Sequence, residues 1–397
     1  MIRNILHVLD VSLPVVSGYS TRSQYILLNQ KKLGLNSFAV TSPHHPNTND
    51  EEVKDGIKFF RTSICGCRIL TPLPIFTELY YVNAVYNRIL EIAMSNPIDL
   101  IHAHSPSLLG LSALRAAKKL ELKVVYEIRA FWEDAAVASG KYSARSLKYR
   151  TVRSLENYVC RKSDRVVTIS QTMKEELMSR RIPNTKITVV PNGVDLSGFE
   201  PERKKVELLS TLGLEGKFVF GYIGTFYDFE GIYDLVDVFH KLHEQEESAV
   251  LLLVGGGETE RAIREKLKEH KADYIKFVGK VPHERVVDYY ALMDVMVYPR
   301  KRTRVTEMTT PLKPLEAMAL GRPVICSSVG GLVELVGKGN GFFFPPGNYD
   351  MLINCCRTLM HDPVMRRELG AKGKERAFTE RSWDKIVKKY VSVYDSL

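Results

Sequence analysis

The chain lacks any long apolar run. No segment of its 397 residues approaches the ~20 consecutive apolar residues that a membrane-spanning helix requires. The amino-terminal residues, MIRNILHVLD, lead directly into a predicted strand and not into a cleavable signal. We therefore expect a cytosolic protein.

Cysteine is scarce, and its spacing does not form a metal site. Of the six cysteines, Cys65 and Cys67 form an isolated C-x-C pair, and Cys355 and Cys356 are adjacent in an apolar helical stretch. Cys160 and Cys326 stand alone. A second C-x-C or C-x-x-C, which a structural zinc site would need, is missing. We expect no structural metal.

Two signatures of nucleotide enzymes are also missing. Residues 255–260 read GGGETE, so an acid stands where the third glycine of G-x-G-x-x-G belongs. This disfavours a nicotinamide-dependent dehydrogenase. No D-x-D pair follows a predicted strand, so we expect chemistry that does not depend on a metal or other cofactor.

The formal charge of +10 allows three kinds of partner, namely nucleic acid, an anionic membrane surface or phosphorylated substrates. The basic residues are dispersed, as in residues 141–165, and no zinc-finger or RNA-binding signature accompanies them. We expect no nucleic-acid partner. Contact with the inner face of the cell membrane and a simple solvated basic surface both stay open.

Short apolar strands alternate with helical stretches along the whole chain, which is typical of doubly wound α/β folds. In the first half the predicted strands are 4–10, 37–42, 100–104, 123–128, 165–170 and 187–192. In the second half they are 217–224, 249–257, 275–279, 294–299, 323–328 and 341–346.

A break at residues 191–205 separates the halves, because Pro191, Gly193, Gly198 and Pro201 interrupt the periodicity there. The sequence therefore predicts two Rossmann-like domains facing a central cleft. We expect residues 1–195 to form the first domain and residues 196–375 the second. Residues 376–397 are expected to form a terminal helix that packs back toward the first domain.

The segment 298–321, YPRKRTRVTEMTTPLKPLEAMALG, connects a predicted strand to a helix. Thr309 or Lys313 can cap that helix, which can begin at Pro311 or Pro314; the sequence leaves both options open. Either start presents free N–H groups that would hold an anion. With Glu307 and other carboxylates nearby to accept hydrogen bonds from hydroxyls, this segment suits a sugar nucleotide.

His102 and His104 lie at the end of the predicted strand 100–104, and we expect only one of them to reach the cleft. A histidine satisfied within the core is the alternative for each residue. Trp132, Glu133 and Asp134 follow another strand, where they can contact an acceptor or simply begin a helix.

The ordered motifs DLIHAHSP, RVVTIS, VVPNGVD, GYIG, VGGG, FVGKV, DVMVYP and PLKPLEAMALGRPVICSSVGG resemble those of the retaining GT-B glycosyltransferases of family 4. The resemblance covers nearly the whole chain. More narrowly, HVLDVSLPVVSGYSTRS, YEIRAFWEDAAVASG and GTFYDFEG are similar to transferases of exosortase-linked exopolysaccharide clusters.

The resemblance implies that Glu316 holds ribose hydroxyls, Glu307 binds the donor sugar and His104 reaches the transferred sugar. It implies a wider set of donor-binding residues, namely Gly18, Gly224, Thr225, Gly255, Gly279, Val281, Arg302, Pro311 and Leu312. Acceptor-side roles would fall to Arg129, Trp132 and Glu133.

This sequence departs from the family pattern twice. Eight residues separate Glu307 from Glu316, where the family usually has seven. Thr225 and Glu230 stand where the family places an Arg and a Lys that neutralise the diphosphate. We expect Lys313, with Arg300, Arg302 or Arg304, to supply the missing charge, and we expect Glu230→Lys to leave donor affinity unchanged or to raise it.

The sequence thus predicts transfer of a sugar from a nucleoside diphosphate, with UDP favoured, to a glycan or lipid-linked acceptor. Two alternatives remain at this stage: a sugar-nucleotide epimerase of the same fold, and a protein that binds nucleotide sugars without catalysis.

Overall fold

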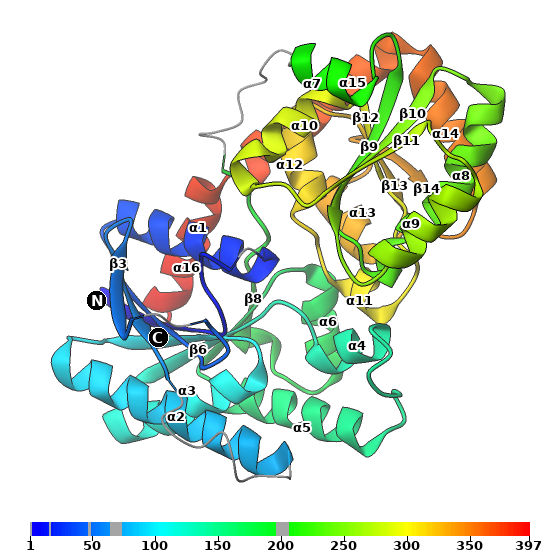
Figure 1. Ribbon diagram of the computed structural model, residues 1–397. Coiled ribbons are helices and arrows are strands. Elements are labelled where there is room, and N and C mark those ends of the chain that lie inside the picture. Colours follow the sequence, from blue (N-terminus) through cyan, green and yellow to red (C-terminus); the bar gives the residue numbers. More distant parts are fainter. Residues whose placement is uncertain (1, 16, 47–48, 64–73, 196–205) are drawn as a thin grey trace. The chain divides into compact units, whose positions relative to one another are not determined.

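The computed structural model describes residues 2–15, 17–46, 49–63, 74–195 and 206–397 of the chain. They form two compact units, the first comprising residues 1–192 and 383–397 and the second residues 193–382 (Figure 1). Residues 376–382, which the sequence grouped with the terminal helix, belong to the second unit. Cys65, Cys67, Gly198 and Pro201 lie outside the described residues.

The first unit contains an eight-stranded sheet in the order β3-β4-β2-β1-β5-β6-β7-β8. All neighbours are parallel except β3 and β4. The strands are β1 (Asn4–Leu9), β2 (Asn36–Thr41), β3 (Glu51–Lys54), β4 (Ile57–Arg61), β5 (Leu100–His104), β6 (Lys123–Ile128), β7 (Arg165–Thr168) and β8 (Ile187–Val189). Strands β1, β2, β5 and β6 are buried almost throughout, as expected for parallel strands covered on both faces.

Helices cover both faces of this sheet. Figure 1 shows α1 and α16 side by side on one face and α2, α3 and α5 on the other. The helices of this unit are α1 (Gly18–Lys32), α2 (Pro74–Ser95), α3 (Ser107–Leu120), α4 (Trp132–Ala138), α5 (Leu147–Lys162), α6 (Gln171–Ser179) and α16 (Trp383–Asp395), with a 3-10 turn η1 (Asn184–Lys186). Trp383, Ile386, Val387 and Tyr390 of α16 join the core with Ile5, Val125 and Val167 of the sheet.

The second unit contains a six-stranded, wholly parallel sheet in the order β11-β10-β9-β12-β13-β14. Its strands are β9 (Phe218–Thr225), β10 (Ala249–Gly256), β11 (Ile275–Gly279), β12 (Val295–Tyr298), β13 (Val324–Ser327) and β14 (Phe342–Phe344). In chain order this is 3-2-1-4-5-6, the strand order of the Rossmann fold. With the β3 edge strand set aside, the first unit repeats the same order and adds one strand.

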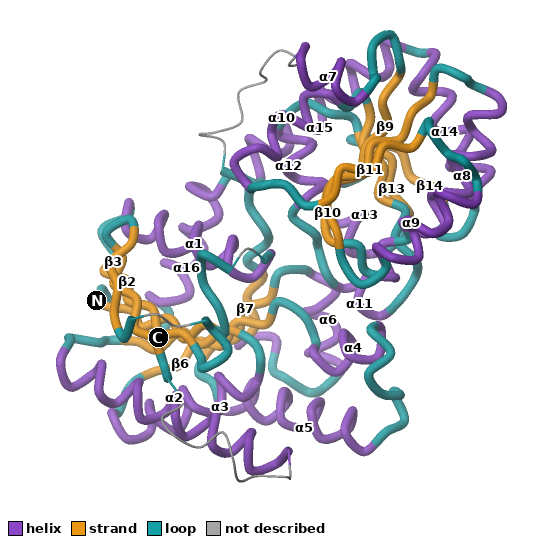
Figure 2. Tube along the Cα trace, in the orientation of Figure 1, coloured by secondary structure: helices purple, strands orange, loops and turns teal. Residues whose placement is uncertain are grey.

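Helices also pack on the sheet of the second unit, as the separated strand and helix colours of Figure 2 show. They are α7 (Val206–Leu212), α8 (Ile232–Gln245), α9 (Glu260–Glu269), α10 (Val286–Leu292), α11 (Arg304–Met308), α12 (Lys313–Ala319), α13 (Gly330–Val336), α14 (Tyr349–His361) and α15 (Pro363–Glu380), with 3-10 turns η2 (Asp228–Glu230) and η3 (His283–Arg285). None of the described helices in either unit combines the length and apolarity needed to cross a bilayer.

All twelve predicted strands are confirmed to within a few residues, and β3 and β4, which form a hairpin, are the described strands that the prediction missed. The hairpin turn, Asp55-Gly56, has φ values of 54° and 70°, the left-handed pair that a two-residue hairpin requires. The Asp-Gly pair was a usable signal, but β3 is short, charged and largely exposed, so apolar patterning did not reveal it.

Candidate functional site

Each sheet reverses its strand order at one place, between β1 and β5 in the first unit and between β9 and β12 in the second. Open α/β sheets bind ligands outside the carboxyl ends of their strands at such reversals. The side chains that each unit gathers there are therefore the candidates for a ligand site.

Several predicted donor-binding residues share the carboxyl edge of the second sheet. Gly224 and Thr225 end β9, Gly255 lies near the end of β10, and Gly279 ends β11, with Val281 following. Gly255 has a φ of 134°, and a Cβ built there would lie 1.9 Å from the carbonyl oxygen of Gly224. Only glycine fits at that position, which keeps the ends of β9 and β10 close together.

The connection after β12 is more ordered than the sequence indicated. It contains the short helix α11, whose N-cap Thr303 forms a capping box with Thr306. The next helix, α12, begins at Lys313, with Leu312 as N-cap and Pro314 as its second residue. The Pro311 start is therefore wrong, as is the expectation that Thr309 or Lys313 caps the helix. Thr309 instead ends α11 in an extended conformation.

The two acids of the segment are each held by a cation of the same segment. The Nε of Arg302 lies 2.9 Å from Oε1 of Glu307. The Nζ of Lys313 donates to both carboxylate oxygens of Glu316, at 3.1 and 2.9 Å. The structure thus brings four predicted site residues together as two ion pairs.

Further contacts fix each acid from the opposite side. The backbone N–H of Gly330, the first residue of α13, donates to Oε2 of Glu307 at 2.7 Å. The hydroxyl of Tyr290 donates to Oε2 of Glu316 at 3.2 Å, and Glu316 is only 8% exposed. Burial, with Glu316 beside it, raises the pKa of Tyr290 well above its usual value, so the hydroxyl stays protonated and remains a donor.

Glu230, which stands where the family usually has a lysine, is neutralised within the unit. Arg300 donates from Nε and Nη2 to its two carboxylate oxygens, at 3.0 and 2.6 Å, and from Nη1 to the carbonyl of Thr309 at 3.1 Å. Both Arg300 and Glu230 are buried. Arg300 therefore balances the charge of Glu230 within the unit.

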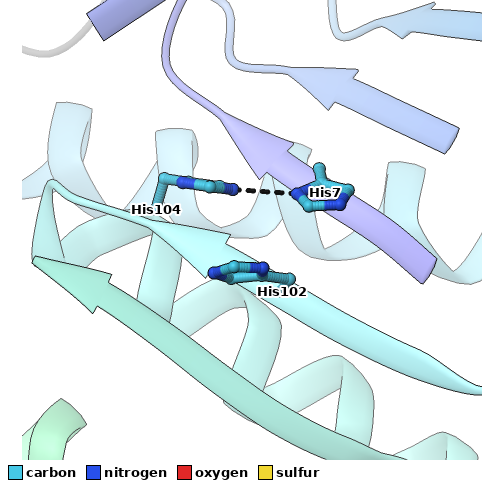
Figure 3. Close-up of side chains that lie close together, drawn as sticks. All are labelled: His7, His102 and His104. Atoms are coloured by element: carbon cyan, nitrogen blue, oxygen red, sulfur yellow. Dashed lines mark hydrogen bonds between the residues drawn. The ribbon is translucent and has the colours of Figure 1, made fainter. Parts of the chain in front are cut away.

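In the first unit, three histidines meet across the strand reversal (Figure 3). His7 of β1 is in register with His102 of β5, and His104 follows two residues later. The rings of His102 and His104 stack with centroids 4.4 Å apart, and His7 lies 3.0 Å from His104 through Nδ1 and Nε2. His102 and His104 lie on the same side of the strand, because residues two apart in a strand share a face. Both are buried, as in the alternative of a core histidine.

The three rings are buried and neutral. Burial and neighbouring His104 lower the pKa of His7 to about 3, and burial with Arg129 lowers the pKa of His104 to about 4. Burial also lowers the pKa of His102 well below its usual value. One ring nitrogen of each lies within 4.8 Å of the others, close enough to suggest a metal site.

A buried carboxylate lies beside the histidines. Glu127 of β6 accepts hydrogen bonds from the Nε of Arg22 at 3.0 Å, the Nε of Arg129 at 2.7 Å and the hydroxyl of Tyr390 at 2.5 Å. Burial alone would raise the pKa of Glu127, but Arg22 and Arg129 hold it well below its usual value. Two guanidinium groups around one carboxylate leave a net positive charge, which disfavours a cation among the histidines.

The predicted acceptor-side residues differ in accessibility. Arg129 is buried, and its donors serve Glu127, His104, Ser23 and the carbonyl of Tyr19.

The other two of these residues begin α4. Glu133 is fully buried and accepts from Nη1 of Arg180 at 2.7 Å. Trp132 is 36% exposed, with its ring 6.2 Å from that of Tyr19. Of the three predicted acceptor-side residues, Trp132 is the one whose side chain reaches the surface of its unit.

Gly18 is the first residue of α1, directly after N-cap Ser17 in the connection that follows β1. Sequence reasoning missed most of the histidine environment, namely His7, Arg22, Gln30, Glu127, Tyr390 and Tyr394. The register of β1 against β5 was a possible signal for His7. The return of the last helix to the first unit was predicted and is confirmed, but the sequence did not indicate that its Tyr390 and Tyr394 would reach the histidines.

Two family models match the chain. One, described as Glycosyltransferase Family 4, matches residues 26–197, and the other, described as Glycosyl transferases group 1, matches residues 217–362. The chain is 25% identical over 276 residues to the capsular polysaccharide biosynthesis glycosyltransferase CapM of Staphylococcus aureus, covering 64% of this chain and 70% of CapM. It is 23% identical over 388 residues to the GDP-mannose-dependent alpha-mannosyltransferase of Mycolicibacterium smegmatis, covering 97% and 95% of the two chains.

Solved structures share the fold over the full length. Sucrose-phosphate synthase from Thermosynechococcus elongatus aligns with a TM-score of 0.78 at 22% identity, covering 99% of this chain and 98% of that one. HepE of Anabaena, in complex with UDP and glucose, aligns with a TM-score of 0.77 at 17% identity, covering 100% of both chains.

Proposed function

Because this chain belongs to the family 4 glycosyltransferases of GT-B fold, we propose that it moves a sugar from a UDP-sugar to a glycan or lipid-linked acceptor with retention of configuration. The observation that carries the donor assignment is the ion pair of Lys313 and Glu316 at the start of α12, in the connection that follows β12 in the second unit. Its carboxylate suits hydroxyl groups and its ammonium suits phosphate. UDP is favoured because HepE binds it, whereas the mycobacterial relative is named for GDP-mannose, so the base needs a direct test.

Donor binding would exchange partners within the two ion pairs. Ribose hydroxyls would donate to Glu316 and sugar hydroxyls to Glu307, while Lys313 and Arg302 would turn toward the diphosphate. No charge of the two pairs would be left without a partner, because each carboxylate would gain hydroxyl donors and each cation would gain the diphosphate. This exchange explains how acids and cations of one segment can both serve the donor.

In the proposed reaction the bond between the sugar and the diphosphate breaks while an acceptor hydroxyl attacks from the same face. Lys313 stabilises the charge that develops on the leaving diphosphate. That phosphate can itself take the proton of the attacking hydroxyl, so no separate base is assigned. We also propose that the transfer does not depend on a metal, because the sequence has no D-x-D pair after a predicted strand.

The acceptor side is proposed from sequence alone. The segments around Tyr19, Trp132 and Glu230 are similar to exosortase-linked exopolysaccharide transferases, which favours a lipid-linked glycan as acceptor. A lipid-linked acceptor and the charge of +10 together suggest work at an anionic membrane surface. Co-sedimentation with acidic vesicles at low salt, but not with neutral ones, tests that surface.

The donor is tested by thermal unfolding of the protein with UDP, GDP, ADP and their sugars. A ligand at 100 times its Kd adds about 2.7 kcal/mol of stability, so the cognate nucleotide should raise Tm clearly above the others. Nucleoside diphosphate released only when acceptor is present supports transfer. A new sugar nucleotide or free sugar formed from donor alone points to epimerisation, and binding without turnover on any acceptor points to a non-catalytic protein.

A further inference from the structure

The three buried histidines belong to a chain of hydrogen bonds whose ends carry opposite polarity. His104 lies 2.6 Å from Nη2 of Arg129 through Nδ1. From His104 the chain passes to His7 and then to Oε1 of Gln30, at 2.9 Å. It continues from Nε2 of Gln30 to the hydroxyl of Tyr394 at 2.8 Å.

The far end of the chain returns to Glu127. The hydroxyl of Tyr394 lies 2.8 Å from Nδ1 of His102, and Nε2 of His102 faces Oε2 of Glu127 at 3.6 Å. That nitrogen has no hydrogen-bond partner among the residues that the structure describes. Arg129 itself donates to Glu127, so both ends of the chain lie beside the same carboxylate within the first unit.

Such a chain can be hydrogen-bonded in two opposite senses, because each neutral imidazole, amide and hydroxyl both donates and accepts. Reversing the sense moves the proton of every histidine to its other nitrogen and turns the Gln30 amide over. The residues inside the chain do not decide between the senses. The residues at its two ends do.

Arg129 has N–H donors and no acceptor, so Nδ1 of His104 must accept and Nε2 must carry the proton. Glu127 is ionised, and its negative charge 3.6 Å away favours a proton over a lone pair on Nε2 of His102. Both ends select the same sense. His104 then donates from Nε2 to His7, His7 donates from Nε2 to Gln30, and the Tyr394 hydroxyl donates to His102.

We propose that Arg129 is a positioning residue that fixes His104 as the Nε2–H tautomer, so that His104 serves the transfer reaction as a hydrogen-bond donor and not as a base. The only lone pair of the neutral ring is held by Arg129. A substrate hydroxyl that replaced His7 as the hydrogen-bond partner of Nε2 would face an N–H group and could only accept a hydrogen bond from it.

The Nε2–H tautomer of His104 also makes the three histidines a poor metal site. A metal shared with His7 and His102 would need the lone pair of His104 Nε2, which carries the proton as long as Arg129 donates to Nδ1. The net positive charge of Arg22, Arg129 and Glu127 opposes a cation further. The neutral state that the argument needs holds at pH 7, since the pKa of His104 is lowered to about 4.

The tautomer can be read directly by long-range proton–nitrogen NMR correlation on the full chain labelled with nitrogen-15 histidine, with His104→Gln used to assign the signals. We expect His104 to show a protonated Nε2 and an unprotonated Nδ1 from pH 6 to pH 8. Arg129→Lys, which keeps a donor, should preserve this pattern. Arg129→Met should shift His104 toward the Nδ1–H form, because Glu127, 3.6 Å from Nδ1, becomes its nearest partner.

The control is Arg180→Met, which removes another buried arginine of the same unit and should leave the His104 signals unchanged. A protonated Nδ1 in the parent, or an unchanged pattern in a folded Arg129→Met protein, would overturn the proposal. If Arg129→Met does not fold, the parent and Arg129→Lys spectra still decide the tautomer.

Turnover supplies the functional part of the test, and this part rests on the proposed function. Glutamine at 104 presents a donor near the place of Nε2 without needing Arg129. We therefore expect Arg129→Met to lower turnover about 10-fold, equivalent to about 1.4 kcal/mol, in the parent but not in the His104→Gln background. Equal losses in both backgrounds would contradict the positioning role. Absence of transfer by the parent would reject the proposed function and leave the NMR result standing.

Discussion

Arg300 holds Glu230 with two hydrogen bonds, Nε to Oε2 at 3.0 Å and Nη2 to Oε1 at 2.6 Å, and both side chains are buried. Glu230 belongs to the turn after β9 and Arg300 follows β12, so the pair ties together the two strands at which the sheet order reverses. The negative charge of Glu230 is thereby balanced by Arg300.

This pair adds a cost in stability to Glu230→Lys, for which the sequence led us to expect unchanged or higher donor affinity. Glu230→Lys would place a second cation against buried Arg300 in place of its carboxylate partner. We now expect the substitution to destabilise the second unit by about 3–5 kcal/mol, the cost of a buried charge left without its counter-ion. Denaturant unfolding of Glu230→Lys and of Arg300→Met measures this. Wild-type stability in either variant would show that water still solvates the charges of Arg300 and Glu230 and would contradict this prediction.

Glu316→Ala should weaken nucleotide binding by ~1.5–3 kcal/mol, because a buried carboxylate that accepts two hydroxyl hydrogen bonds is removed. Calorimetry with the nucleotide selected by thermal unfolding measures the loss. Glu246→Ala is the matched control, since Glu246 pairs with Arg357 and His361 just before β10, at the opposite end of the strand from Gly255. Unchanged affinity in a folded Glu316→Ala protein would remove Glu316 from the donor site.

Lys313→Ala should lower turnover ~10- to 100-fold, a loss of about 1.4–2.8 kcal/mol, because the developing charge on the diphosphate loses its nearest cation. Donor affinity should fall less than turnover, since the charge grows as the bond breaks. Steady-state kinetics of the variant beside Lys338→Ala, an exposed lysine between α13 and β14, separates this effect from a general loss of charge. Full activity of Lys313→Ala would contradict the assignment.

Turnover should survive chelation. Cationic side chains can take the place of a divalent metal at a diphosphate, and the sequence offers no D-x-D pair to hold one. Initial rates in EDTA should therefore equal those in untreated enzyme. A loss of activity that manganese or magnesium restores would show that the transfer requires a metal.

Glu156 of α5 should make stability depend on pH. Its carboxyl oxygens are buried without a hydrogen-bond partner in the described part of the chain, and burial, with Glu133 nearby, raises its pKa from 4.5 to about 8. The folded state therefore holds a proton that the unfolded state has lost between these values, so this group's contribution to stability is present below pH 4.5 and is lost as the pH rises toward 8.

Glu156→Gln keeps the shape of the protonated acid and cannot ionise. Relative to the parent, it should gain stability between pH 5 and pH 8, on the order of 3 kcal/mol for a shift of this size. Thermal unfolding across that range measures the gain, with exposed Glu175→Gln as the control. Parallel pH profiles for the parent and Glu156→Gln would show that Glu156 is already ionised in the fold.

Much of the fold was determined locally and could be predicted from the sequence. Apolar stretches such as those of β10 and β12 are buried on both faces, so their composition alone marks them as parallel strands. The glycines at the strand ends were also recognisable, and the structure places Gly224, Gly255 and Gly279 at the carboxyl ends of β9, β10 and β11. The role of these glycines and of the two acids of the segment 298–321 in binding a nucleotide sugar stays a prediction. The helix start at Lys313 was not recognisable, since Pro311 and Pro314 offered equivalent local signals and the helix begins at neither of them.

Only the tertiary structure decided how charge is arranged at these sites. Glu230 lies 70 positions from Arg300, and Glu127 lies 263 positions from Tyr390 and 105 from Arg22. Local sequence patterns reach a few residues along a strand or helix, whereas the protonation state of His104 depends on the guanidinium of Arg129 and the carboxylate of Glu127, which the neighbouring strand β6 brings to it. The sequence determined which groups the protein has, and the packing of β1, β5, β6 and α16 decided which of them donate and which accept.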